Sequence, residues 1–417
     1  MISKEENKME YVLLSKLFYQ DREKQKALYQ KRYESESTYH FNFYVKEHPA
    51  FCVISKEIHA LCCNIYEYKS KLYEMLSQIP GDIINHFTKT CLIDEVKLTN
   101  EIEGVQSTRQ EINALIEHLP SRKKNSRLYG LVKKYLLLLD INEEIPLNAC
   151  EDIRSLYNEL CLPEVIAEDK NNAPDGKLFR KEIVNVLSPT QKPIHQGSYP
   201  EAKIISEMEQ ALNILHDEKI PSLIRIAVFH YLFGYIHPFY DGNGRTNRFI
   251  SSYFLSKEIE PLVALRLSYM VKYLLKNYYD SFTYGNDPHN FGDLTPFIIE
   301  FLTIILYAQQ DLLQRLEDDN KRFSFYLNQI ENMIKSSDEL KEPAYKILFY
   351  LLLNSLFNDR GISVDELAKE SDISISTVRK YIKKFKEAGY LKISKESYNN
   401  LYDIDLNVLE RYNDKTQ

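Results

Sequence analysis

Apolar residues recur at three- and four-residue spacing along most of the chain, which is the pattern of amphipathic helices. The pattern is clear over residues 51–139 and 202–239. After a glycine-rich break it returns in 247–259 and 293–316. Residues 1–48 are polar and weakly patterned, and we expect them to be helical in parts. The sequence therefore predicts a mainly α protein.

One segment, residues 171–200, interrupts the helical pattern. Proline, glycine and asparagine are frequent in it, and the run EIVNVL at 182–187 favours a short strand. From composition alone the segment is a hairpin or loop, and a simple surface connection is the plainest interpretation.

A different order of elements begins at residue 342. An apolar helix is predicted for 342–355, and Ser363 with Glu366 three residues later forms a capping box that starts a short helix. A basic helix follows, then a glycine and a β-leaning run. The apolar face of the basic helix consists of Val378, Ile382 and Phe385. This order resembles a winged helix-turn-helix, with Ser374–Glu387 as the recognition helix.

The polar face of that recognition helix is strongly basic. It carries Arg379, Lys380, Lys383, Lys384 and Lys386. A run of charge is usually a solvated face, but on a recognition helix it also suits contacts with phosphates and the major groove. Contact with DNA, contact with a protein and formation of a homodimer remain alternatives for this module.

Composition and charge narrow the class of protein. The chain has 417 residues, enough for two to four domains, with 44% hydrophobic and 27% charged residues, as in ordinary globular chains. A net charge of −7 gives no global attraction to nucleic acid, so any such binding needs a local basic face. The N-terminus has no apolar signal region, and the apolar runs fall short of the ~18 uninterrupted residues of a membrane span. We expect a cytoplasmic protein with no membrane contact.

Six cysteines are dispersed in helix-like surroundings, without a C-x-x-C pair and without a histidine at ligand spacing. The sequence therefore predicts free thiols in a reducing compartment and no zinc site.

The break between two apolar helices, HPFYDGNGRTNR at 237–248, has the highest concentration of residues that can bind or react with a ligand. Gly242 and Gly244 allow positive φ and close approach of a ligand, and the helix that follows offers free N–H groups to an anion. Arg245 and Arg248 are three residues apart and can grip neighbouring phosphates. The same stretch supplies a carboxylate for Mg²⁺, Asp241, and a base, His237.

This stretch resembles the signature of the Fic family, H-P-F-x-[D/E]-G-N-G-R-x-x-R. It matches at every fixed position, namely His237, Pro238, Phe239, Asp241, Gly242, Asn243, Gly244, Arg245 and Arg248. The resemblance implies a Fic-fold helical bundle with a short β-hairpin flap, plus the C-terminal winged helix domain. It also implies transfer of AMP from ATP to a Ser, Thr or Tyr hydroxyl of a protein target, which can be the chain itself.

The resemblance also implies roles for the motif residues. His237 would be the catalytic base and Asp241 the Mg²⁺ ligand. The nucleotide and its phosphates would be bound by Gly242, Asn243, Gly244, Arg245 and Arg248. The flap, residues 182–197, would pair with the extended target segment.

A second match lies upstream, where Thr99, Glu103 and Gly104 fit the Fic pattern [S/T]-x-x-x-E-[G/N]. Composition alone would make Gly104 a corner between helices. The resemblance instead implies an N-terminal inhibitory helix at 94–104, in which Glu103 forms a bidentate pair with Arg248. In some relatives the same glutamate positions a water that removes the nucleotide again.

Downstream, residues 275–297 resemble the Fic segment that closes on the nucleoside, which suggests Tyr278, Tyr279 and Asn286 near adenine or ribose. Packing of these tyrosines against the last helices of the bundle is the alternative. His230, about two helical turns before His237, could suggest a metal pair. We favour core packing for His230.

The predicted domains are an N-terminal helical region (1–93), the Fic domain (94–310), a helical linker (311–341) and the winged helix domain (342–410). The leading hypothesis is a regulated protein adenylyltransferase with ATP as substrate and Mg²⁺ as cofactor. The alternative is a DNA-binding regulator that uses the Fic domain as a nucleotide sensor. A toxin of a toxin–antitoxin pair is disfavoured because the inhibitor lies within the chain.

Overall fold

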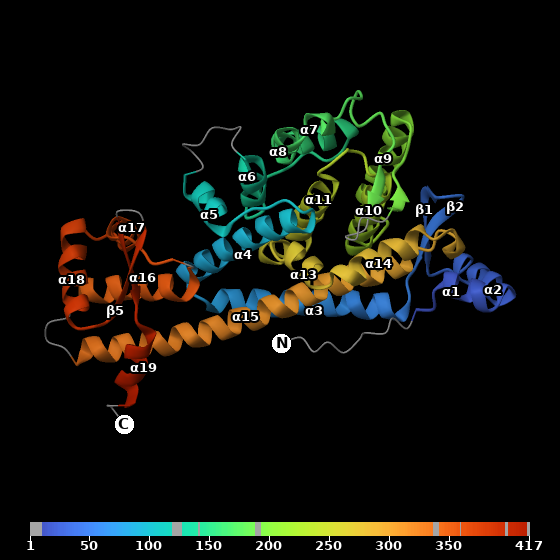
Figure 1. The fold of residues 1–417 in the computed structure, drawn as a ribbon. Helices are drawn as coiled ribbons and strands as arrows, with labels where there is room; N and C mark the ends of the chain where they lie inside the picture. The colour runs from blue at the N-terminus through green and yellow to red at the C-terminus, as the bar shows by residue number, and fades with distance from the viewer. Residues whose placement is uncertain are drawn as a thin grey trace. The chain divides into compact units, whose positions relative to one another are not determined.

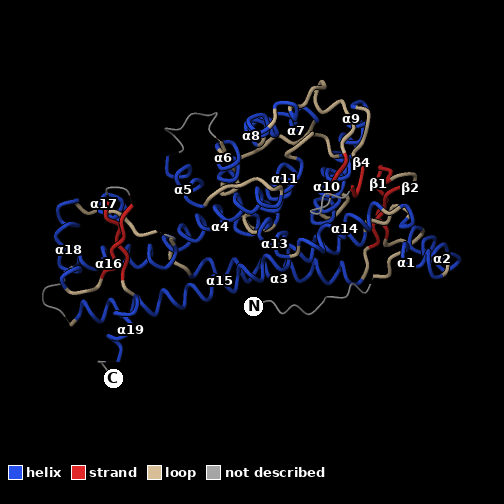
Figure 2. The backbone as a smooth tube through the Cα atoms, viewed as in Figure 1, coloured by secondary structure: helices blue, strands red, loops and turns tan. Residues whose placement is uncertain are grey.

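The computed structural model describes residues 11–118, 127–140, 142–187, 193–336, 342–358, 360–396 and 399–414. These residues are mainly helical, with three two-stranded antiparallel hairpins (Figures 1 and 2). They divide into two compact units. Unit 1 lies within Met1–Leu72 and Cys91–Leu312, and unit 2 lies within Tyr73–Thr90 and Leu313–Gln417.

Unit 1 begins with α1 (Leu14–Gln20), α2 (Arg22–Tyr33), β1 (Thr38–Val45), β2 (His48–Val53), α3 (Lys56–Gln78), α4 (Gly81–Ile102), α5 (Arg109–His118), α6 (Tyr129–Leu137), α7 (Cys150–Leu160) and α8 (Leu162–Glu168). It continues with β3 (Asn185–Leu187), β4 (Pro193–Gln196), α9 (Glu201–His216), α10 (Ser222–Ile236), α11 (Asn243–Glu258), α12 (Pro261–Ala264), α13 (Leu267–Tyr273), α14 (Leu275–Asn286) and α15 (Thr295–Lys335). The last residues of α3, the first residues of α4 and the last residues of α15 belong to unit 2.

The centre of unit 1 is α10, which is apolar on all sides and has 12 of its 15 residues buried. It packs against α9 and α11. Only residues 237–242 separate the end of α10 from the start of α11. The motif loop is therefore anchored at both ends in the core.

The N-terminal region is helical in parts, as expected, in α1 and α2, but residues 38–53 form the antiparallel hairpin β1–β2, which was not predicted. In β1, Phe41, Phe43 and Val45 are buried and the residues between them are exposed, which is the two-residue period of a strand. Residues 11–72 share a compact unit with the motif loop.

Helix α15 is the one helix of the described residues that is long and apolar enough, by length and composition, to cross a membrane. In its apolar window 67% of the residues are buried inside the protein, so α15 serves as a core helix of this fold. All six cysteines are free.

Unit 2 contains α16 (Glu342–Phe357), α17 (Val364–Ser371), α18 (Ile375–Glu387), β5 (Leu391–Glu396), β6 (Asn399–Ile404) and α19 (Leu406–Asp414). The capping box of Ser363 and Glu366 is present, and Ser374 caps α18. Val378, Ile382 and Phe385 form the buried face of α18 together with Tyr381. A second strand, β6, pairs with the predicted one to make the wing. The predicted winged helix-turn-helix is confirmed.

Candidate active site

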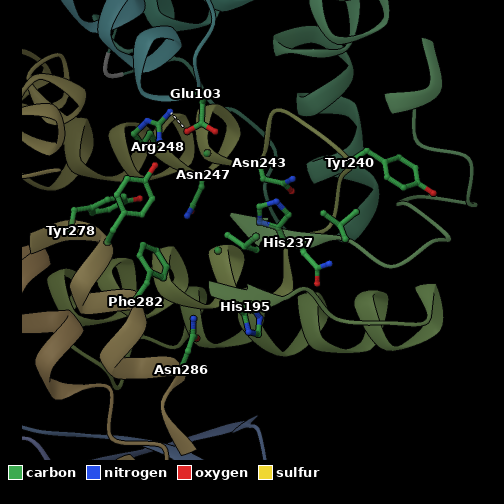
Figure 3. A pocket seen from close by; sticks show the side chains of 16 residues that line it. Glu103, His195, His237, Tyr240, Asn243, Asn247, Arg248, Tyr278, Phe282 and Asn286 are labelled. Atoms are coloured by element: carbon green, nitrogen blue, oxygen red, sulfur yellow. Dashed lines mark ion pairs between the residues drawn. The ribbon is translucent and has the colours of Figure 1, made fainter. Parts of the chain in front are cut away.

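A pocket in unit 1 is lined by four of the fixed motif residues, His237, Asn243, Gly244 and Arg248 (Figure 3). Its walls come from the end of α10, the start of α11, helix α14, the hairpin β3–β4 and Glu103 after α4. The lining residues are Glu103, Val184, Asn185, Val186, His195, Gly234, His237, Tyr240, Asn243, Gly244, Asn247, Arg248, Tyr278, Tyr279, Phe282 and Asn286.

His237 caps the C-terminus of α10 with a left-handed backbone (φ 52°) that turns the chain from the helix into the loop. Its half-buried side chain points into the pocket (Figure 3). Burial, with smaller effects of Arg180 and His195, lowers the pKa of His237 to about 3. The imidazole is therefore neutral and can accept a proton.

The backbone carbonyl of His237 accepts a hydrogen bond from Arg180 Nε at 2.9 Å. Arg180 is fully buried, and sequence reasoning missed it because it lies 57 residues upstream in a stretch with the composition of a loop. Nothing in the sequence around a lone arginine before a short strand indicates that its side chain will be buried against His237.

Gly242, with φ 78°, caps the N-terminus of α11, where the first N–H groups lack intrahelical partners. Asn243 holds the loop: its Oδ1 accepts from Phe239 N at 2.9 Å, and its Nδ2 donates to Phe239 O at 2.8 Å. Its side chain is therefore engaged with the loop backbone. The backbone N–H groups at the start of α11 are of the kind that binds anions.

Arg245 is 1% exposed and is absent from the pocket lining. Its Nη1 pairs with Glu164 Oε2 at 2.6 Å, and its Nη2 lies 3.5 Å from Asp241 Oδ2. Glu164, on α8, is a partner that the sequence did not reveal. Nε and Nη2 of Arg245 are buried and have no hydrogen-bond acceptor among the described residues.

Among the described residues no cluster of three side chains could hold a metal by itself. Asp241 is partly exposed, beside the anion-binding start of α11. A single carboxylate there fits Mg²⁺, which usually takes one or two carboxylates and completes its shell with phosphate oxygens and water.

Arg248 is 1% exposed and is tied to the residues predicted for it. Its Nη2 lies 2.8 Å from Glu103 Oε1, the ion pair drawn in Figure 3. Thr99 supplies two further acceptors, Oγ1 to Arg248 Nε at 3.0 Å and O to Nη2 at 2.9 Å. The pair is thus one contact supported by Thr99, whereas we expected a bidentate fork. Burial opposes the charge, but Glu103 raises the pKa of Arg248 above its ordinary value.

Gly244 makes room for this ion pair. A Cβ at this position would collide with Glu103 Oε1 and would lie 2.9 Å from Arg248 Nη1. Gly244 has no positive φ, unlike Gly242, so its small size is what the site uses. Gly104 has φ 79° and turns the chain after α4.

The helix that carries Thr99 is anchored by a buried carboxyl group, Glu95. Glu95 Oε2 accepts from Ser268 N at 2.8 Å, and Oε1 accepts from Ser268 Oγ at 2.6 Å and from Tyr135 at 3.3 Å. Burial raises the pKa of Glu95 to about 7, although these hydrogen bonds and the charge of Arg248 act to lower it. No sequence pattern had indicated this residue.

The aromatic wall of the pocket comes from α14, with Tyr278, Tyr279, Phe282 and Asn286 in the lining. Asn286 Oδ1 accepts from the Tyr231 hydroxyl at 2.8 Å. His230 is fully buried, with Nδ1 2.7 Å from Ser251 Oγ and Nε2 2.8 Å from the Tyr278 hydroxyl. Core packing of His230 is confirmed, and Tyr278 both packs in the core and lines the pocket.

The predicted flap is the hairpin β3–β4, in which Asn185 pairs with Gln196 and Val186 with His195. Residues 188–192 of the predicted 182–197 lie outside the described residues. Asn185, Val186 and His195 line the pocket, so the flap borders the same space as His237.

The basic residues of the winged helix belong to unit 2 and do not line this pocket. Arg379, Lys380 and Lys383 are exposed on α18, and Lys384 is half-buried.

In a comparison with known protein families, two parts of the chain each match a family. Residues 151–255 match the Fic/DOC family, and residues 346–392 match a winged helix-turn-helix DNA-binding family.

Among similar proteins are those named protein adenylyltransferase Fic from Drosophila sechellia and Nematostella vectensis, each 30% identical over 122 residues. The match covers 28% and 25% of this chain, and 23% and 26% of those proteins. The chain thus spans about a quarter of the length of these curated relatives. The crystal structure of a Fic family protein from Desulfovibrio desulfuricans G20 has a TM-score of 0.49 and 18% identity, over 85% of this chain and 97% of that one.

Proposed function

Because residues 151–255 form a domain of the Fic/DOC family, we propose that the chain is a protein adenylyltransferase whose resting state is inhibited by Glu103. The observation that carries the proposal is the meeting of a neutral base, His237, and a tethered arginine, Arg248, around one pocket. The substrate would be ATP, and the acceptor a Ser, Thr or Tyr hydroxyl of a protein.

His237 would take the proton of the acceptor hydroxyl as its oxygen attacks the α-phosphorus. The new P–O bond forms as the bond from the α-phosphorus to the bridging oxygen breaks, and pyrophosphate leaves. The free N–H groups at the start of α11 would stabilise the charge on the phosphates. Asp241 would hold Mg²⁺, which screens the phosphate charge when bound.

Arg248 is the residue that would bind the γ-phosphate, and in this structure Glu103 and Thr99 occupy its Nε and Nη2 donors. One guanidinium cannot serve Glu103 and the γ-phosphate in the same geometry. With its outer phosphate displaced, the α-phosphorus of ATP would not lie in line with the hydroxyl, and such alignment supplies much of the rate.

Glu103→Gly should therefore raise the rate of automodification by roughly tenfold or more. Correct placement of the phosphates lowers the activation free energy, and each ~1.4 kcal/mol of that decrease speeds transfer about tenfold. The measurement is intact mass after incubation with ATP and Mg²⁺, in which each transfer adds one AMP. Glu101→Gly is the matched control, since Glu101 lies at the same end of α4 but pairs with Lys272 at 3.1 Å. Equal labelling of wild type and Glu103→Gly would count against inhibition.

A nucleotide sensor without catalysis is the competing function, and His237→Ala separates the two. Loss of AMP transfer with ATP binding retained supports the enzyme. Transfer that continues without His237 would refute its role as base.

DNA binding by unit 2 is a second candidate function, favoured by the family match and by the exposed Arg379, Lys380 and Lys383. A mobility shift with random duplex should weaken as salt rises, because bound cations are released. Arg379→Ala/Lys383→Ala should lower affinity and reduce the salt slope by about one for each phosphate that the variant no longer neutralises. Lys321→Ala/Lys335→Ala removes two exposed lysines of α15 as a control. No shift for wild type at low salt would exclude this function.

A further inference from the structure

Arg180 is a buried cation held by neutral groups. It is 0% exposed, and among the described residues no carboxylate forms an ion pair with it. Its acceptors are all backbone carbonyls. Nε donates to His237 O at 2.9 Å, Nη1 to Glu182 O at 2.5 Å, and Nη2 to Ser198 O at 2.9 Å and Ile236 O at 3.4 Å.

Two of these carbonyls, those of Ile236 and His237, belong to the C-terminal end of α10. Such carbonyls lack intrahelical partners and carry the negative end of the helix dipole, so a cation is stabilised there. This explains how an arginine can be fully buried at this point without an acid. Arg180 N also donates to Pro238 O at 3.2 Å, which adds a main-chain bond to the same turn.

The other two carbonyls belong to the flap. Glu182 precedes β3 and Ser198 follows β4, so one planar guanidinium joins both arms of the hairpin to the backbone of His237. Two main-chain hydrogen bonds join the same parts of the chain: Gly197 N donates to Val184 O, and Ser198 N donates to Ile236 O, each at 3.0 Å. A Cβ at Gly197 would collide with Arg180 Nη2 and would lie 3.1 Å from His237 Cβ, so this glycine lets the three parts meet.

We propose that Arg180 is a positioning residue that fixes the flap against His237, and so sets the distance between a target segment paired with the flap and the base. This inference rests on the proposed function, in which the flap pairs with the target. A lysine has one compact head group and cannot reproduce a planar fork over four carbonyls. Nucleotide binding should be largely independent of Arg180, because under the proposed function the nucleotide lies against α11 and α14, and Arg180 is not among the residues that line the pocket.

The test uses the chain of 417 residues carrying Glu103→Gly, with Arg180→Lys and Arg180→Met. We expect AMP transfer to fall by roughly 100-fold, since small misplacement of reacting groups costs about that much, while the Kd for ATP stays within about threefold. Amide hydrogen exchange should quicken in 182–187 and 193–198. Arg154→Met is the matched control: Arg154 donates to Leu178 O at 2.7 Å just before this region, but does not contact the flap.

Transfer that survives in Arg180→Lys or Arg180→Met would overturn the proposal, as would unchanged exchange in the flap. A parallel loss of ATP binding and thermal stability would also overturn it, since Arg180 would then be needed only for folding. If Glu103→Gly itself transfers no AMP, the proposed function fails, and flap exchange in Arg180→Met still decides whether Arg180 fixes the hairpin.

Discussion

At the scale of single residues, His237 combines accessibility from the pocket with a depressed pKa. Burial is the main cause, and Arg180 and His195 add to it. Protonated imidazole cannot act as a base, so lowering the pKa keeps the reactive form populated below the ordinary histidine range.

The pH dependence of catalysis should reflect this. In the Glu103→Gly chain, kcat/KM for AMP transfer should hold as pH falls from 8 to about 5.5, because the folded pKa of His237 is about 3 and not the ordinary ~6.5. Transfer rates at constant ionic strength give the measurement, with circular dichroism to verify that the chain stays folded. An acid limb centred near 6.5, absent from ATP binding, would show that His237 titrates normally.

The residues of the motif could be read directly from the sequence, but the side chains that support them could not. The motif places His237, Gly242 and Arg248 within twelve positions, and such spacing is visible in one dimension. Arg180 lies 57 residues from His237, and Glu164 lies 81 residues from Arg245. Only the packing of helices brings these side chains together, and nothing in their local sequence distinguishes them from solvated charges.

At the scale of elements, α4 carries Glu95 and Thr99 one helical turn apart, and Glu103 follows one turn later. Glu95 fixes the helix to α13 through Ser268 and to α6 through Tyr135. Its burial favours the protonated form, so the anchor is sensitive to pH.

Glu95→Gln should remove that sensitivity. The native state keeps a proton on Glu95 that the unfolded chain loses above about pH 4.5, so this group's contribution to stability is full below that pH and is lost as pH rises through about 7. From pH 5 to pH 8, the free energy of unfolding should shift in favour of Glu95→Gln by about 2 kcal/mol relative to wild type. Urea unfolding of both chains across this range is the measurement. Parallel pH profiles would contradict the assigned ionisation.

The elements themselves were predictable in different degrees. Helices such as α9 and α18 follow the apolar spacing, and the caps at Ser363 and Ser374 mark the starts of α17 and α18. The hairpin β1–β2 escaped prediction because its turn contains no glycine or asparagine; the left-handed residue there is Lys46, with φ 56°.

At the scale of the whole molecule, the N-terminal residues belong to the unit that holds the pocket. Asp293, which follows α14, is 1% exposed and is bound by Tyr11 at 2.8 Å and Arg32 at 3.2 Å. Burial raises the pKa of Asp293 despite the opposing effect of Arg32. Sequence patterns indicated no role for residues 1–48. In the structure, Tyr11 and Arg32 hold Asp293 and so support the end of the aromatic wall.

Arg32→Met should therefore destabilise the chain by about 3–5 kcal/mol at pH 7, the usual cost of leaving one buried charge without its partner. Urea unfolding monitors the loss, and Arg22→Met serves as control because Arg22 is exposed on the same helix. Adding Asp293→Asn to Arg32→Met should recover part of the stability. A loss below ~1 kcal/mol would mean that Asp293 does not depend on Arg32.

The tether on Arg248 comes from positions one turn apart on a single stretch of chain, Thr99 within α4 and Glu103 just past its end. The ion pair comes from the turn after α4, whereas the two Thr99 bonds come from the helix itself. Under the proposed function, a signal that activates the chain therefore has to displace only this turn, and α4 can stay in place.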